Sequence, residues 1–139
     1  GRRGCWETEI GEDSVIKGLG GRRRDNIDTL LARIAPADAT AGLARVGRWL
    51  GLGLANLVNI FNPEVVVFGG LLRRILPLVD EHLQNEFATA LIASREQVRF
   101  VLPALEQDSA LLGAAESVFA PLMDDPLGNL GPPRAVAVA

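Results

Sequence analysis

A short run of β-branched and aromatic residues, Val65 to Phe68, constrains the fold more than any other feature of this sequence. Its unbroken apolar character is typical of a strand that is covered on both faces. Asn62-Pro63 ends a helix before it, because proline lacks the backbone donor and restricts the preceding residue. Gly69-Gly70 interrupts the chain directly after it. The sequence therefore predicts a central strand between two helices, which is an α/β arrangement.

The helices on either side are indicated by apolar residues at three- and four-residue steps, over residues 38–61 and 72–91. The first of them carries four glycines, and each glycine costs a helix about 1 kcal/mol relative to alanine. We expect close packing against a neighbouring backbone to compensate, above all at Gly47 and Gly51, which share the apolar face. Pro77 is expected in the first turn of the second helix or at a kink.

Towards the amino terminus, residues 5–19 have apolar side chains at helical spacing and are predicted to form one helix. Gly20-Gly21 supplies the left-handed stop that ends many helices. The basic run from Arg22 to Arg24 is most simply a solvated loop. Asp25 is predicted to cap a further helix over residues 26–34.

Towards the carboxyl terminus, a second strand over residues 98–102 and a helix that begins at Asp108 or Ser109 repeat the order of strand and helix. Residues 124–139 contain proline and glycine without periodicity, so they are predicted to be a disordered tail. We therefore predict one domain over residues 1–123.

The composition of the 139 residues excludes several classes of protein. Hydrophobic residues make up 48% and charged residues 22%, which suits one globular core. The formal charge of −3 is opposite to that of a nucleic-acid-binding domain. No apolar run approaches the roughly 18 to 20 residues that span a bilayer. A single cysteine permits no intrachain disulfide, so we predict a cytoplasmic protein.

Signatures of enzymes are absent from the sequence, and we predict no catalytic residue. There is no Gly-rich phosphate loop followed by lysine and no G-x-S-x-G elbow. Cys5 and His82, the only cysteine and histidine, cannot complete a four-ligand zinc site. Two candidates for a site remain: Cys5 with Glu7, and the pair Gly69-Gly70 at the carboxyl end of the predicted strand. Cys5 could equally be a small packed residue, and the glycine pair could serve only a tight turn.

Three stretches of the sequence resemble the carboxyl-terminal half of the ROK family (repressors, open reading frames and sugar kinases). They are GRRGCWE at 1–7, GLANLVNIFNPEVVVFGG at 53–70 and DSALLGAAESVF at 108–119. The resemblance implies the distal lobe of an actin-like ATPase and sugar-kinase fold, which is ribonuclease H-like, helix-rich and built around a small sheet.

The same resemblance assigns roles to four residues. Glu7 resembles the carboxylate that binds sugar hydroxyls, and Cys5 resembles the last cysteine of a zinc motif. The other zinc ligands would lie before Gly1, so zinc is expected only together with them. Gly69 and Gly70 resemble the glycines on the adenosine side of the family's kinases. The apolar pair that follows them, where those kinases continue with glycine or a small polar residue, weakens the case for ATP.

The resemblance also implies what the chain does. The family's phosphate-binding Asp-Gly-Gly loop and catalytic aspartate have no counterpart here, so the chain is not expected to phosphorylate a sugar by itself. Our first hypothesis is the effector-binding and dimerisation lobe of a sugar-responsive ROK transcriptional regulator. A sugar or sugar phosphate would be its effector, a second copy its partner, and DNA would bind only through an absent helix-turn-helix. The alternatives are the distal lobe of an ATP-dependent hexose or N-acylhexosamine kinase, and a self-associating domain without a ligand.

Overall fold

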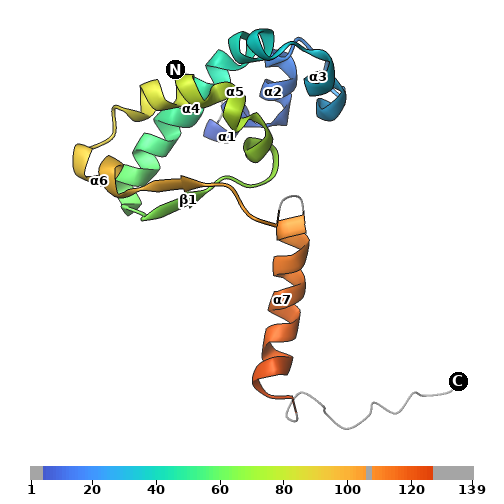
Figure 1. Ribbon diagram of the computed structural model, residues 1–139, viewed down its shortest axis with the longest axis vertical. Coiled ribbons are helices and arrows are strands. Elements are labelled where there is room, and N and C mark those ends of the chain that lie inside the picture. The colour runs from blue at the N-terminus through green and yellow to red at the C-terminus, as the bar shows by residue number, and fades with distance from the viewer. Residues whose placement is uncertain (1–4, 106–107, 127–139) are drawn as a thin grey trace, which may run out of the picture. The chain divides into compact units, whose positions relative to one another are not determined.

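The computed structural model describes residues 5–105 and 108–126. It divides into two units, residues 1–102 and 103–139, which are described in turn. The first unit is helix-rich with a small sheet, and α4 and α5 form its body (Figure 1). In chain order, its elements are α1 (Trp6–Ile10), α2 (Glu12–Gly18), α3 (Ile27–Arg33), α4 (Pro36–Phe61), β1 (Val65–Val67), α5 (Gly70–Phe87), α6 (Ile92–Gln97) and β2 (Arg99–Val101).

The helix predicted over residues 5–19 is in fact two helices, α1 and α2, separated by Gly11. The backbone of Gly11 is extended, with φ −75° and ψ 177°. A Cβ at Gly11 would lie 2.7 Å from the carbonyl oxygen of Glu7, so this turn leaves no room for a side chain. The stop at Gly20 is confirmed, because its φ is +75° and the next amide bonds back to Ile16.

The cap of α3 is Asn26 and not Asp25 as predicted. The Asn26 side-chain oxygen accepts from the backbone amide of Thr29 at 3.1 Å, as an N-cap does. Asp25 instead accepts from the amide of Arg22 at 2.7 Å and closes the loop that carries the basic run. A carboxylate and an amide are both good caps, so the local pattern could not distinguish these two adjacent residues.

The long helix α4 begins two residues before the predicted start, because Pro36 stands in its first turn, where no backbone donor is required. It ends at Asn62, whose left-handed conformation (φ 44°, ψ 53°) lets its amide donate to the Val58 carbonyl at 2.9 Å. One side of α4 is buried along its whole length. The buried residues are Ala39, Leu43, Val46, Gly47, Leu50, Gly51, Leu54, Ala55 and Val58.

Three of the four glycines of α4 are places where another backbone approaches closely, as predicted. A Cβ at Gly47 would lie 2.9 Å from the carbonyl oxygen of Val79 in α5. A Cβ at Gly51 would collide with the carbonyl of Leu83, one turn further along α5. Gly42 meets the backbone of α2 in the same way. The absence of side chains therefore lets α4 lie directly against two other helices.

The two strands form a parallel pair in which Val65, Val66 and Val67 face Arg99, Phe100 and Val101. Within the described residues the sheet holds only these strands, and Val65 and Val67 are exposed. The prediction of a strand covered on both faces is therefore not met by this part of the chain. The middle of β1 and the residue after it do reach the core: Val66 is half-buried, and Phe68 lies edge-on to Phe100 with ring centroids 5.3 Å apart.

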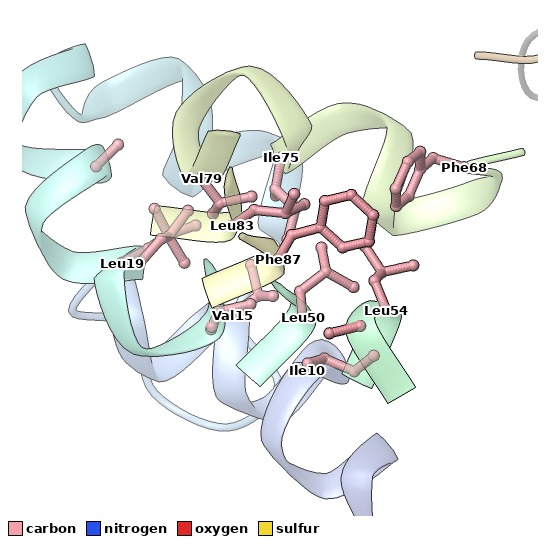
Figure 2. Close-up of a cluster of buried hydrophobic side chains, with 14 of the residues drawn as sticks. Ile10, Val15, Leu19, Leu50, Leu54, Phe68, Ile75, Val79, Leu83 and Phe87 are labelled. Atoms are coloured by element: carbon pink, nitrogen blue, oxygen red, sulfur yellow. The ribbon is translucent and has the colours of Figure 1, made fainter. Parts of the chain in front are cut away.

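The helix α5 follows β1 after the glycine pair, so the order of helix, strand and helix is confirmed. Pro77 stands inside α5, beyond the first turn, and its side is exposed. Buried residues recur along the other side, namely Ile75, Val79, Leu83 and Phe87. Figure 2 shows them meeting side chains of α1, α2 and α4 in one cluster. Among the helices of the described residues, none combines the length and the hydrophobicity that a bilayer span requires.

The second unit contains α7 (Ser109–Asp124). Asp108 precedes it at the predicted cap position, but its side chain makes no capping bond there. None of the residues of α7 is buried, and several of its large apolar side chains are exposed. The predicted tail lies outside the described residues from position 127 onward.

The contact between α4 and α5 makes a prediction about Gly51. We expect Gly51→Ala to lower the free energy of unfolding by about 1 kcal/mol, because overpacking costs about 1–3 kcal/mol and the helix-propensity gain of alanine is about 1 kcal/mol. The free energy of unfolding is measured by urea titration. Gly113→Ala is the control, since a Cβ there meets nothing within 4 Å. A Gly51→Ala protein that gains as much stability as the Gly113→Ala protein would contradict the close contact.

Candidate functional site

Three residues of α1 hold it against α4. Trp6 Nε1 donates a hydrogen bond of 2.7 Å to the carbonyl oxygen of Trp49. Glu9 accepts from the guanidinium of Arg45 through both carboxylate oxygens, at 2.7 to 3.0 Å. Ile10 is buried in the core. Because positions i, i+3 and i+4 lie on one side of a helix, these contacts determine which side of α1 faces outward.

The outward side carries the predicted sugar-binding residue, Glu7. It is exposed and lines a shallow cavity of about 450 Å³. The lining consists of Cys5, Glu7, Thr8, Gly11, Glu12 and Asp13. The lining holds three carboxylates and no lysine or arginine, although Asp13 also makes an exposed ion pair of 3.8 Å with Arg23 outside the lining. Carboxylates accept hydroxyl donors with charge-assisted strength, and the cavity is therefore suited to a ligand rich in hydroxyl groups.

Cys5 stands at the edge of the same cavity, immediately before α1. Its Sγ lies 3.6 Å from Thr8 Oγ1. Hydrogen bonds from the side chain and the backbone of Thr8 lower the pKa of the Cys5 thiol below its ordinary value. A thiolate is the form that binds metals and reacts with electrophiles. The thiol of Cys5 is exposed, so both kinds of reagent can reach it.

Zinc requires more donors than the described residues bring together. In residues 5–105 and 108–126, no group of three or more cysteine, histidine or acidic side chains could hold a metal ion. The other residue type typical of zinc sites, His82, is half-buried on α5 beside Gly47. The role of Cys5 as a zinc ligand stays a prediction that depends on ligands outside the described part of the chain.

Gly69 and Gly70 lie at the amino end of α5 and are not part of the cavity around Glu7. Gly70 has φ +55°, a conformation that side chains rarely adopt, so the turn itself calls for glycine. A Cβ at either position would meet nothing within 4 Å. The space beside the pair is open, and no side chain of the described residues fills it.

Two groups of residues at the site escaped prediction from the sequence. Glu12 and Asp13 join Glu7 because the turn at Gly11 folds α2 back beside α1, whereas a continuous helix would have carried them away. Gly53 accommodates the indole of Trp6. Its position in the sequence could have indicated this role. Gly53 does not lie on the side of α4 that Gly47 and Gly51 share, so it could have been expected to contact a different segment.

Comparison with known proteins identifies the family of the chain. The model of the ROK family matches residues 1–120. The chain belongs to the ROK family, which implies an actin-like ATPase fold.

Two relatives give the comparison more detail. The xylose repressor of Bacillus subtilis (strain 168) is 28% identical over 130 residues, which cover 89% of this chain and 33% of the relative. The xylose repressor of Bacillus spizizenii (strain ATCC 23059 / NRRL B-14472 / W23) is 27% identical with the same coverage. The chain thus spans about a third of the length of these relatives. No solved structure matches the chain.

The contact between Cys5 and Thr8 makes a prediction about reactivity. Thr8→Val removes the hydroxyl, so the pKa of the Cys5 thiol should rise towards its ordinary value. The rate of alkylation by iodoacetamide should then reach its midpoint at a higher pH than in the wild type, with Cys5 as the only thiol that reacts. Thr89→Val is the matched control, because Thr89 binds only the Glu86 carbonyl in the described structure. A pH profile that does not change in Thr8→Val would contradict the assignment.

Proposed function

We propose that the chain is the sugar-binding and dimerisation lobe of a ROK transcriptional regulator, the distal lobe of its actin-like fold. The observation that carries this proposal is the acidic cavity with Glu7 on the outward side of α1. Its three carboxylates outnumber the one arginine paired with them, Arg23 on Asp13, so the cavity suits a neutral sugar better than a sugar phosphate. The names of the relatives support a regulator and make xylose the first sugar to test.

The proposed mechanism is linkage between sugar binding and DNA binding. A sugar held by Glu7 and by a second lobe binds the closed arrangement of the two lobes better than the open one. It shifts the equilibrium towards closure by that difference in affinity. DNA binding belongs, in this proposal, to a helix-turn-helix outside the 139 residues. Its affinity for DNA changes with closure, and by reciprocity DNA changes the affinity for the sugar.

Dimerisation is supported by the exposed apolar end of α4. Ile60 and Phe61 are adjacent and are 72% and 70% exposed. Single exposed apolar residues are normal, but two large neighbours at this exposure are typical of a contact surface.

The alternative is the distal lobe of a sugar kinase, in which Gly69 and Gly70 would lie against the adenosine. The open space beside the pair is compatible with it. The repressor names of both relatives favour the regulator. Incubation of the longest natural form of the protein with ATP and xylose distinguishes the two, because a kinase transfers phosphate to the sugar and a regulator does not.

The proposal predicts the effect of Glu7→Gln on sugar binding. The substitution keeps the size of the side chain and removes its charge. Because hydrogen bonds to charged groups contribute about 1.5–3 kcal/mol, we expect xylose to bind about tenfold to a hundredfold more weakly. The measurement is isothermal titration calorimetry on the longest natural form of the protein.

Glu81→Gln is the matched control, since Glu81 is an exposed glutamate on α5. It should bind xylose as the wild type does. Equal affinities of the Glu7→Gln and wild-type proteins would remove the role assigned to Glu7. Absence of binding by the wild type to xylose and to a panel of other pentoses and hexoses would contradict the proposed function.

A further inference from the structure

We propose that Trp6, seated on Gly53, is a positioning residue that sets the place of Glu7 at the ligand. This inference rests on the proposed function, because it concerns the same carboxylate. Glu7 directly follows Trp6, and the indole is the contact of α1 that combines shape with a directed hydrogen bond. Three observations carry the inference: the space at Gly53, the acceptor that this space uncovers, and the weakness of the other contacts of α1.

The indole of Trp6 occupies the space that a side chain at position 53 would fill. A Cβ on Gly53 would overlap three atoms of the ring, Cε2, Cζ2 and Nε1. Gly53 is two residues from Gly51, which is about 200° around the helix. It therefore faces away from the contact with α5, and the missing side chain serves Trp6 instead.

The same missing side chain uncovers an acceptor on α4. In a helix the carbonyl of residue 49 accepts from the amide of residue 53, one turn later. Because position 53 has no side chain, the Trp49 carbonyl can also accept a hydrogen bond from the indole N–H of Trp6, at 2.7 Å. An indole can only donate, and it has a single polar hydrogen. The bond therefore selects one orientation of the ring on α4.

The other contacts of α1 constrain its orientation on α4 less. The Ser14 hydroxyl donates to the Thr8 carbonyl at 2.7 Å, but Ser14 belongs to α2. Arg45 is 68% and Glu9 23% exposed, so their bidentate pair is directed but is screened by salt, whereas the bond of the neutral indole is not. Ile10 contributes burial, which is not directional. A helix of five residues has no stability of its own. The direction in which Glu7 points consequently depends on Trp6.

The test compares Gly53→Ala, Trp6→Ala and the double variant with the wild type. Gly53→Ala should weaken xylose binding about tenfold or more, because small displacements of a positioned group are costly, and should lower the melting temperature. Once Trp6 is alanine, Gly53→Ala should not lower the melting temperature further, since the ring that it displaces is gone. Trp6→Ala and the double variant, which both lack the indole, should bind xylose more weakly than the wild type.

A purely structural role of Trp6 predicts otherwise, because affinity would then follow stability. Folded Trp6→Ala protein that binds xylose within twofold of the wild type would overturn the inference. Gly113→Ala, at a helical glycine with open space around it, is the control and should neither weaken xylose binding nor lower the melting temperature.

Amide hydrogen exchange tests the inference even if the wild type binds no sugar, an outcome that contradicts only the proposed function. The amide of Gly11 donates to the Glu7 carbonyl at 2.7 Å and reports the order of α1. This amide should exchange faster in Gly53→Ala and in Trp6→Ala than in the wild type. Its exchange rate in Gly113→Ala should equal that of the wild type. Equal exchange in all four proteins would show that Trp6 does not position this segment.

Discussion

The direct approach of other backbones to α4, where glycine replaces a side chain, is the contact on which the rest of the first unit depends. The backbone of α2 packs closely against Gly42, and the backbone of α5 packs closely against Gly47 and Gly51. Each glycine weakens the isolated helix, so α4 gains its stability from these neighbours more than from its own propensity. A different side of the same helix admits the indole of Trp6 at Gly53. One helix thus holds both the hydrophobic core and the segment that carries Glu7.

Local chemistry and periodicity were enough to predict much of this arrangement. The apolar repeat of α4, its end at Asn62 and the strand before Gly69 are encoded within short stretches of sequence, and the structure confirms them. The break at Gly11 was missed because the apolar period continues across it. The cap at Asn26 was missed because Asp25, one residue earlier, has equivalent capping chemistry. The exposure of Val65 and Val67 depends on what covers the sheet, which no local pattern contains.

The candidate site was predictable to a similar degree. Cys5 and Glu7 are close in the sequence, and the resemblance to a family named both. Glu12 and Asp13 complete the cavity only through the turn between α1 and α2, which required three-dimensional information. The glycine pair before α5 belongs to a different place in the fold and shares no cavity with Glu7 in the described residues. The sugar hypothesis and the nucleotide hypothesis can therefore be tested on separate residues.

The hydrogen bond between Trp6 and Trp49 has an optical consequence. These are the two tryptophans of the chain, which has no tyrosine, and both are half-buried, Trp6 on α1 and Trp49 on α4. Fluorescence excited at the red edge of protein absorption therefore originates from α1 and α4 alone, and the indole of Trp6 lies where the two helices meet. The chain carries its own spectroscopic probe of the α1 attachment, and no dye has to be introduced to follow it.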